Sequence, residues 1–397
     1  MTPQADRIAS LDVLRGLGIL GILAVNASVF AQPFALQFDP VVLGPMDPDS
    51  TNVWALVHVA FERKFVTLFS MLFGASILLV GGDGTDPERN RILYRRLGWL
   101  ALFGLIHGAA VWYGDILLCY AVTGFVAVLF RRWTPRRLIV TGALMTTVMA
   151  GFEAVDAWNS ALASADAAQA ISFANPEAAR VEISAFGGDF ASSLIANFEH
   201  WQVMAGYTLY FVPATLGLML MGMGLFRTGV LKAERSAGLY ALLLAAGLAS
   251  MALLGWAAWR EVGSVFTDAP AGALRESING VLSPVMTLGY VGLICLIVKS
   301  PLRWLTGPLA AAGQMAFTNY LTQSLIMTAI FYGGRGLGLF GSLTLAQVAP
   351  IVVGVWVLQL VWSPLWLMAF RYGPFEWVWR SLTFGRPVAF RRVAGEA

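Results

Sequence analysis

Long apolar stretches without a charge alternate with short loops along this chain, and every second loop is basic. Twenty of the 26 Lys and Arg residues fall in these loops or near the two ends of the chain. They are Arg7, Arg15, Arg89, Arg91, Arg95, Arg96, Arg131, Arg132, Arg136, Arg137, Arg227, Lys232, Arg235, Lys299, Arg303, Arg371, Arg380, Arg386, Arg391 and Arg392. The other six are Arg63, Lys64, Arg180, Arg260, Arg275 and Arg335. Short loops rich in Lys and Arg stay in the cytoplasm, so the pattern predicts a multi-pass membrane protein with both termini cytoplasmic.

The composition excludes an ordinary soluble fold. Hydrophobic residues make up 58% of the chain and charged residues only 12%, against roughly 25% charged residues in soluble domains. The basic residues therefore indicate topology and contact with membrane lipids rather than a nucleic-acid partner. Cys119 and Cys295 both lie inside apolar runs, which favours small core residues over a disulfide. Three histidines without a Cys cluster do not indicate a metal site.

The apolar runs predict an all-α membrane protein, a bundle of about ten transmembrane helices, because backbone groups in lipid must be satisfied within one segment. About 20 apolar residues suffice to cross a bilayer. The predicted spans are residues 12–31, 60–82, 97–113, 115–131, 138–156, 203–226, 237–259, 279–298, 306–334 and 348–370. The first run is too long for a cleavable signal peptide. We expect residues 1–397 to form a single domain.

Two long segments are predicted on the side opposite the basic loops. Residues 32–59 contain four prolines and three aspartates, which favours an irregular, ordered lid. Residues 157–202 are Ala-rich and polar and are expected to form a partly helical outer-side loop region, while residues 371–397 form a cytoplasmic tail. This topology predicts that a cysteine at Ser164 is labelled from outside the cell, and one at Ala394 only after lysis.

The first span opens with an acidic and a basic residue. Asp12 and Arg15 are three positions apart, so they share one helix face and can form an ion pair. A charge inside an apolar span is costly and is a candidate functional residue. The pair either fixes the start of the helix, with Ser10 or Asp12 as its cap, or binds an anionic ligand.

The second span begins with a cluster of ionisable residues. His58 and Glu62 would share one face of a continuous helix, whereas Lys64 would point elsewhere. A buried cluster of this kind shifts pKa values and can supply acid–base chemistry. The alternative is a patch at the outer head groups whose long side chains reach water.

His107 lies inside an otherwise apolar span, and Asp115 follows it at the next turn. The near-neutral pKa of histidine makes His107 the best general base in the chain; the alternative is an interhelical hydrogen bond. Eight residues extend about 12 Å along a straight helix, so we do not expect the two side chains to touch within one helix. Asp115 is instead a candidate N-cap of the following helix.

Two further clusters lie toward the C-terminus. Asn319 and Gln323 are four positions apart within one apolar span, and their amides either bind a polar ligand or hold neighbouring helices together. A Gly-Pro pair follows the last span. Beyond it, Glu376 and Arg380 predict an i,i+4 ion pair on a short amphipathic helix at the cytoplasmic interface.

Five sequence blocks together resemble the YeiB-like family of bacterial inner-membrane proteins, whose C-terminal half is defined as a domain of unknown function. The blocks are Leu11–Gly16, Lys64–Gly74, Gly104–Gly108 with Gly114–Leu117, Gly313–Ser324 and Gly373–Thr383. His107, Asp115, Lys64 and Asn319 fall on the family's motif positions, which favours His107 over His58. The resemblance implies a location in the bacterial inner membrane.

The opening Asp-x-x-Arg-Gly, which begins at Asp12, is also similar to that of transmembrane acyltransferases, including the lysosomal enzymes that acetylate heparan glucosamine. Those enzymes take acyl-CoA from the cytoplasm, use a His for acyl transfer and hold the acceptor on the other side. The similarity implies His107 or His58 as the base. It also implies that Asp12, Arg15 and cytoplasmic arginines bind a phosphorylated donor such as acyl-CoA, and that the acceptor is a lipid or a sugar. In those enzymes the His precedes a second-span motif, close to where His58 stands.

Two other hypotheses remain open. A small-molecule transporter or channel would place Lys64, Asp115 and Asn319 along its path, although the sequence lacks a clear inverted repeat. A non-enzymatic membrane component is the third reading. A tunnel that opens to the cytoplasm and ends near His107 would favour the enzyme. No resident cofactor is expected, and a homodimer is kept as a candidate assembly.

Overall fold

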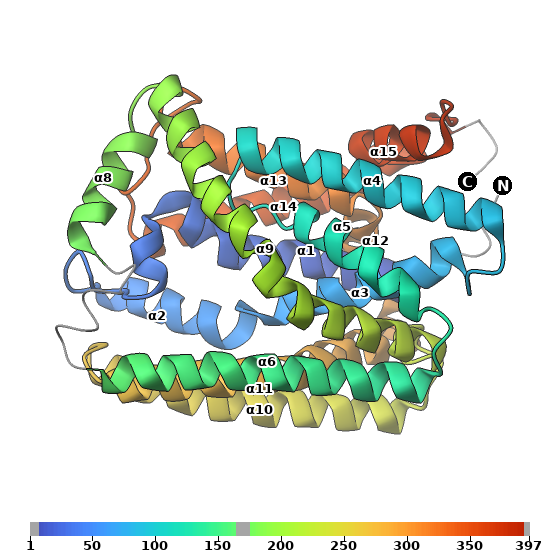
Figure 1. Ribbon diagram of the computed structural model, residues 1–397, viewed down its shortest axis with the longest axis horizontal. Coiled ribbons are helices and arrows are strands. Elements are labelled where there is room, and N and C mark those ends of the chain that lie inside the picture. The colour runs from blue at the N-terminus through green and yellow to red at the C-terminus, as the bar shows by residue number, and fades with distance from the viewer. Residues whose placement is uncertain (1–7, 164–174, 393–397) are drawn as a thin grey trace.

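The computed structural model describes residues 8–163 and 175–392, which form helices joined by turns and short loops (Figure 1). The first half contains α1 (Ala9–Ala31), η2 (Phe34–Gln37), α2 (Pro48–Leu56), η3 (Val57–Phe61), α3 (Lys64–Gly81), α4 (Pro87–Ala110), α5 (Leu117–Ala127), η4 (Val128–Phe130) and α6 (Pro135–Leu162). The second half contains α8 (Pro176–Phe186), α9 (Phe190–Arg227), α10 (Ala237–Gly263), α11 (Ala269–Lys299), η5 (Pro301–Thr306), α12 (Gly307–Gln314), α13 (Ala316–Phe331), α14 (Leu345–Ala369) and α15 (Pro374–Phe384). Ser164 and Ala394 lie outside the described residues.

All ten predicted spans coincide with a helix or with consecutive helices. Seven helical segments in the described part of the chain are long and apolar enough to cross a membrane. The other three predicted spans correspond to α4, to the short apolar segment Leu117–Phe130, and to α12 followed by α13. The first turns of α4 contain basic residues, and the helix is interrupted at Met315 between α12 and α13. The prediction of an all-α, multi-pass membrane protein is confirmed.

The helix α1 runs through the centre of the bundle, where it contacts α3, α11, α12, α13 and α14. Along the lower edge of Figure 1, α6, α10 and α11 lie side by side, and α9 connects this layer to α3, α4 and α5. The crossing of α1 and α12 is close. A Cβ atom on Gly16 would lie 1.9 Å from the Leu309 carbonyl oxygen, and one on Gly313 only 1.8 Å from that of Asp12. Small residues permit such approaches between membrane helices.

Polar and apolar side chains are distributed as expected for a protein in lipid. Large apolar residues such as Leu144 and Phe152 on α6, or Leu242 on α10, are exposed on the outer helices. In contrast, Lys64 and Asn319 are fully buried. Hydrocarbon offers no hydrogen-bond partner, so polar groups must find theirs inside the bundle.

The basic loops gather at one end of the molecule, which we call the basic end. Hydrogen bonds connect them: Arg131 donates to the side chain of Asn90 (2.8 Å), Lys299 to a carbonyl oxygen of the α9–α10 loop (3.0 Å), and Arg95 to the Leu382 carbonyl oxygen in α15 (2.9 Å). The first described turn of α1 lies there too, beside α15. The opposite end, which we call the acidic end, contains residues 32–47, α2 and α8.

The lid segment is more helical than predicted. Residues 32–59 were expected to be irregular, yet they include η2, α2 and part of η3. Asp47 accepts a hydrogen bond from the Ser50 backbone N–H, and Pro48 follows it, so the proline and aspartate that suggested a loop are the start signals of a helix. The outer segment 157–202 is partly helical, as predicted: α6 extends to Leu162, α8 follows, and α9 begins at Phe190.

Candidate functional site

A chain of three buried polar side chains, Asp115, His107 and Ser324, connects the turn after α4 with α13. His107 Nδ1 lies 2.8 Å from Asp115 Oδ2, and His107 Nε2 lies 2.9 Å from Ser324 Oγ. The sequence predicted no contact between His107 and Asp115 within one straight helix. The contact forms across a turn instead, because α4 ends at Ala110 and the chain turns back before α5 begins. Asp115 also accepts a hydrogen bond from the Leu118 N–H in the first turn of α5 at 2.9 Å, although the N-cap residue of α5 is Ile116 and not Asp115 as predicted.

The carboxylate fixes the tautomer of His107. An ionised Asp115 can only accept, so Nδ1 carries the proton and Nε2 keeps its lone pair. The Ser324 hydroxyl can donate to Nε2 at 2.9 Å in place of its longer hydrogen bond, 3.4 Å, to the Tyr320 carbonyl oxygen. A carboxylate, an imidazole and a hydroxyl in this order form the arrangement that activates hydroxyl nucleophiles. The same contacts also satisfy polar groups between α4, α5 and α13, which is a structural role.

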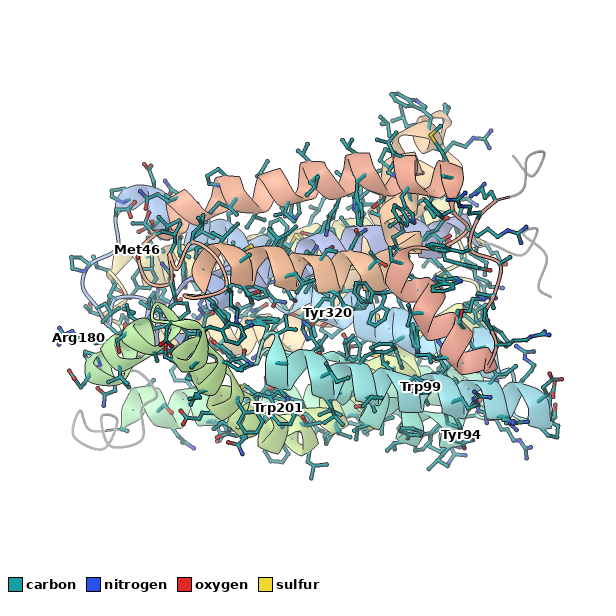
Figure 2. The ribbon with its side chains drawn as sticks, turned by 90° about the horizontal axis from the view of Figure 1, so that it is seen from above. Met46, Tyr94, Trp99, Arg180, Trp201 and Tyr320 are labelled. Carbon is teal, nitrogen blue, oxygen red and sulfur yellow. The ribbon has the colours of Figure 1, made fainter. Side chains whose placement is uncertain are left out.

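A cavity extends from the basic end toward the side chains of Asp115, His107 and Ser324, and we call it the basic-end cavity. Its outer part, about 260 Å³, is lined by Arg15, Arg96 and Arg380. The adjoining inner part, about 210 Å³, is mostly apolar and reaches Tyr320. The Tyr320 ring lies 5.1 Å from the His107 ring between centroids. Figure 2 shows Tyr320 near the middle of the molecule's long axis.

Two guanidinium groups of the basic-end cavity have no carboxylate partner in the described part of the chain. Arg96 stacks over the Trp379 ring at 3.7 Å from its centroid, and Arg380 stacks over an aromatic ring at 4.9 Å. Arg15, by contrast, pairs with Asp12 at 3.1 Å, and this contact confirms the predicted ion pair. Cations without a carboxylate partner suit an anionic ligand such as a phosphate group.

Glu376 caps α13 rather than pairing with Arg380. Its carboxylate accepts hydrogen bonds from the Phe317 N–H (2.7 Å), the Thr318 N–H (2.9 Å) and the Thr318 hydroxyl (2.5 Å). These amides need a partner because α13 begins at a break after α12. The described residues show no ion pair between Glu376 and Arg380, so that predicted pair is wrong, although the predicted short helix is present as α15. Burial raises the pKa of the Glu376 carboxyl.

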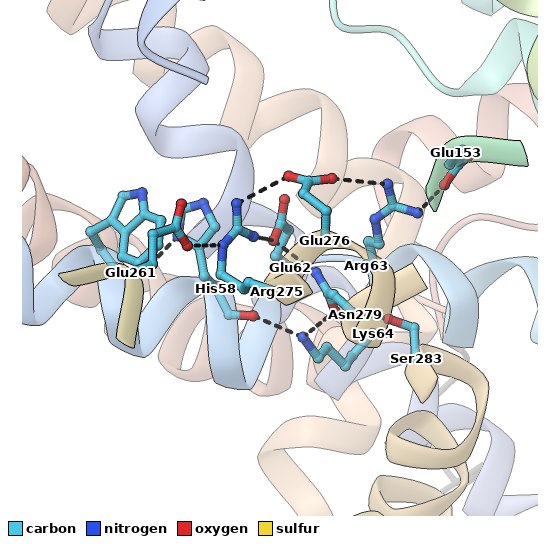
Figure 3. A network of polar contacts seen from close by, with 11 residues as sticks. His58, Glu62, Arg63, Lys64, Glu153, Glu261, Arg275, Glu276, Asn279 and Ser283 are labelled. Atoms are coloured by element: carbon cyan, nitrogen blue, oxygen red, sulfur yellow. Dashed lines mark hydrogen bonds and ion pairs between the residues drawn. The ribbon is translucent and has the colours of Figure 1, made fainter. Parts of the chain in front are cut away.

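A second group of ionisable side chains links α3, α6, α10 and α11 toward the acidic end (Figure 3). Arg275 lies at its centre, with carboxylate oxygens of three glutamates 2.5 to 3.5 Å from its guanidinium. Buried charges require such partners, so the arrangement favours a structural role. The members of this group are Glu62, Arg63, Lys64, Glu153, Glu261, Arg275, Glu276, Asn279 and Ser283.

Lys64 does not lie where a continuous helix would place it. Glu62 is extended and Arg63 has a φ of 65°, so the helix breaks between η3 and α3. The break turns Lys64 inward, where its Nζ donates to the His58 carbonyl oxygen and to Asn279 Oδ1, both at 2.8 Å. The prediction for this segment assumed an unbroken helix, and the break was not foreseen. These contacts favour a role in holding the His58 segment over contact with a substrate.

His58 lies on the wall of a second cavity of about 600 Å³, the acidic-end cavity, formed by α1, α2, α14 and residues 33–47. Its Nδ1 lies 2.7 Å from the Trp54 carbonyl oxygen, and the two rings stack at 4.0 Å. A carbonyl oxygen only accepts, so Nδ1 carries the proton and Nε2 keeps its lone pair. Among the described residues Nε2 has no hydrogen-bond partner.

Asn319 and Gln323 connect helices in the interior. The Asn319 amide donates to the Ala312 carbonyl oxygen and to Ser363 Oγ, both at 3.1 Å. Gln323 donates to Gln359 Oε1 at 2.8 Å and to a carbonyl oxygen of α1 at 3.2 Å. These bonds join α13 to α1, α12 and α14, which favours the interhelical role over ligand binding.

Several residues of these sites escaped the sequence reasoning. Ser324 was one of several hydroxyl-bearing residues in the block Gly313–Ser324, and Arg96 was one of four arginines in its basic loop. No feature of the sequence therefore singles out either residue. Arg275 had a readable signal, because Arg275, Asn279 and Ser283 recur every four residues and form a polar stripe on α11. The described residues contain no group of three or more His, Cys, Asp or Glu side chains placed to hold a metal ion.

Comparison with known proteins identifies the family of this chain. The family model described as "Protein of unknown function (DUF418)" matches residues 225–386. The chain is 32% identical to the uncharacterized protein YeiB of Escherichia coli (strain K12), over 99% of this chain and 98% of that protein. It is 32% identical to the uncharacterized protein YxaH of Bacillus subtilis (strain 168), over 96% of this chain and 94% of that one. No solved structure gives a significant match. Because the identity to YeiB extends over nearly the whole length of both chains, this chain belongs to the YeiB-like family.

Proposed function

We propose that the protein is a membrane-embedded acyltransferase that takes its acyl donor at the basic end. The basic-end cavity carries this proposal, because it joins a mouth lined by arginines to an apolar interior that ends at Tyr320, whose ring contacts the His107 ring. A phosphorylated acyl donor such as acyl-CoA has the same division into an anionic part and an apolar part. The opening sequence at Asp12, which is similar to that of transmembrane acyltransferases, supports the same reaction class.

In this proposal, the guanidinium groups of Arg96 and Arg380 bind the phosphates of the acyl donor. Arg15, which is oriented by Asp12, contributes a third guanidinium group. The acyl chain extends along the apolar wall toward Tyr320. The Tyr320 hydroxyl is buried without a hydrogen-bond partner among the described residues, so it is available to donate to the acyl carbonyl oxygen. A hydrogen-bond donor that points at that oxygen stabilises the negative charge that develops on it during acyl transfer.

His107 is the first candidate for the base. Asp115 orients the ring, and Nε2 takes the proton of the attacking hydroxyl, which displaces Ser324 Oγ from this nitrogen. As the new acyl bond forms, the carbon–sulfur bond of the donor breaks, and His107 returns the proton to the leaving thiolate. His58 is the alternative base, because its Nε2 is unpartnered and it lines the acidic-end cavity.

The first experiment measures donor binding to the protein in lipid nanodiscs, with acetyl-CoA and palmitoyl-CoA as probes. Arg96→Gln and Arg380→Gln should each weaken binding about ten-fold or more, because hydrogen bonds to charged groups contribute roughly 1.5–3 kcal/mol. Arg136→Gln is the matched control, since Arg136 is an exposed arginine of the basic end that does not line the cavity. Absence of binding, or equal losses in all three variants, would contradict the donor site.

The second experiment measures release of free thiol from these donors in the presence of membrane lipid extract. His107→Ala should lower the rate by about 10²–10⁴-fold without changing donor affinity or monodispersity, and His107→Gln should behave similarly. If His58→Ala is instead the inactive, well-folded variant, the base is His58. Wild-type rates in all three variants would exclude the mechanism.

Transport is the second candidate, and one observation favours it. The two cavities lie along the same central helix, since α1 lines the basic-end cavity with Ile19 and Ile22 and the acidic-end cavity with Ala24 and Ala27. A transporter would return its substrate unchanged, whereas acyl transfer alters it. Chromatography of labelled donor from both sides of proteoliposomes therefore distinguishes the two activities.

A further inference from the structure

The acidic-end cavity has the size and depth of a binding site for one lipid chain. Its volume of about 600 Å³ falls within the roughly 300–1,000 Å³ of small-molecule sites. The α14 residues that line it extend from Leu345 to Trp356, which corresponds to about 16 Å along a helix. That depth is about half of the hydrocarbon core, which is roughly 30 Å thick. The cavity therefore extends through about one leaflet.

Exposed apolar residues of α2 and α14 line the cavity. They are Leu56 on α2, which is 58% exposed, and Val353 on α14, which is 50% exposed. Val353 begins a row of exposed residues, continued by Val357, Val361 and Leu365, that recurs every four positions along α14. Such a row is the face that α14 turns toward hydrocarbon. A lipid chain can therefore enter the cavity without passing through water.

The polarity of the wall selects the kind of lipid. The inner part is apolar and includes Ala24, Phe61 and Trp356, whereas amides, hydroxyls and the carboxylate of Asp47 line the outer part. Among the described lining residues none is Lys or Arg. Hydrogen bonds from Ser50 lower the pKa of Asp47, so its carboxylate is ionised and repels a phosphate. His58 also lies on the wall of this cavity, and its Nε2 has no hydrogen-bond partner among the described residues.

We propose that the acidic-end cavity binds an amphipathic lipid with an uncharged, hydroxyl-bearing head group. The lipid enters between Leu56 and Val353, one chain packs against the apolar inner wall, and a hydroxyl donates to His58 Nε2. Such a lipid would be the acceptor of the proposed acyl transfer with His58 as the base, and in this respect the inference rests on that alternative of the proposal. The binding of the lipid does not require acyl transfer and is measured without a donor.

The test uses two photoactivatable lipids that share the same diazirine-bearing chain, a diacylglycerol and a phosphatidylglycerol, in nanodiscs that contain the full chain. After irradiation, peptide mass spectrometry locates the labelled residues. The diacylglycerol should label the cavity wall, at residues such as Ala27, Val57 and Val348, about ten-fold more than the phosphatidylglycerol does, which corresponds to about 1.4 kcal/mol. Labelling confined to Val357 and Val361, or equal labelling of the wall by both probes, would overturn the proposal.

Two variants test the site itself. Val353→Trp should block the mouth and lower labelling of the wall about ten-fold, whereas Val357→Trp, one turn away on the same exposed row and 56% exposed, should leave it unchanged. His58→Phe keeps an aromatic ring against Trp54 but removes the acceptor, so it should lower labelling of the wall by the diacylglycerol about ten-fold. Unchanged labelling of the wall in Val353→Trp or in His58→Phe would contradict the proposal. If the diacylglycerol labels the cavity wall but the protein shows no acyl-transfer activity, the proposed acyl transfer is refuted and the lipid-binding site is not.

Discussion

Asp115 accepts a hydrogen bond from Nδ1 of His107 at 2.8 Å, across the turn that joins α4 to α5. Both side chains are almost fully buried. The contact fixes the tautomer of His107 and leaves its Nε2 to Ser324, so the geometry of three helices depends on one carboxylate. Whatever the chemistry of the site, this relationship has a measurable effect on stability.

Asp115→Ala should lower the free energy of unfolding by about 3–5 kcal/mol, the cost of removing one partner of a buried pair. Asp115→Asn keeps an oxygen acceptor for His107 or for the Leu118 N–H and should cost less. Thermal unfolding in detergent checks both variants, with Asp156→Ala as a control because Asp156 is an exposed acidic residue. Equal melting temperatures for Asp115→Ala and Asp156→Ala would show that the contact does not stabilise the fold.

Lys64 is expected to be a positioning residue whose loss loosens the His58 segment. Lys64→Ala should lower the free energy of unfolding by about 3–5 kcal/mol, because it leaves a buried network without one cation. It should also raise the hydrogen-exchange rate of residues 57–62, since the Lys64 Nζ holds the His58 carbonyl oxygen. Arg260→Ala, at an exposed cation of the acidic end, is the control. An unchanged exchange rate in Lys64→Ala would rule out the positioning role.

The docking of α8 should depend on pH through Glu182. Burial raises the pKa of this carboxyl from 4.5 to about 7. An acid whose pKa is raised in the folded state stabilises that state fully below its unfolded pKa, and this contribution is lost as the pH rises toward the folded pKa. Glu182 accepts a hydrogen bond from the Phe34 N–H at 3.0 Å and lies 3.4 Å from His200 Nε2.

The protection of the α8 amides, which is their intrinsic exchange rate divided by the observed rate at the same pH, should therefore fall from about pH 5 to about pH 8. Glu182→Gln should remove this change in protection because glutamine cannot titrate. Protection that rises over the same range would mean that the ion pair with His200 outweighs the burial of the carboxyl.

The basic end is expected to face the cytoplasm, because its loops contain most of the Lys and Arg residues. A single cysteine at exposed Glu88 should react with an impermeant maleimide only after lysis of spheroplasts, whereas one at exposed Ser184 should react in intact spheroplasts. Cysteine-free background variants, with Cys119 and Cys295 replaced, serve as controls. The reverse pattern would invert the topology and place the proposed donor site on the outside.

The sequence alone determined the class of the protein and the course of its chain. A bilayer accepts only segments of a minimum apolar length, and basic loops mark one side of it. The helical spans, and the side of the membrane on which each loop lies, can therefore be predicted from the pattern of apolar and basic residues. One contact within a regular helix was also predicted correctly. Asp12 and Arg15 are three positions apart and do pair, because α1 is continuous through both residues.

Only the tertiary structure decided which distant residues meet. The break at Arg63 brings Lys64 to His58, the break at Met315 gives Glu376 the free amides of α13, and the turn after Ala110 brings Asp115 to His107. Periodicity assumes an unbroken helix and cannot locate such breaks. Their positions depend on how neighbouring helices satisfy the freed backbone groups and buried charges, and these partners come from segments far apart in the sequence.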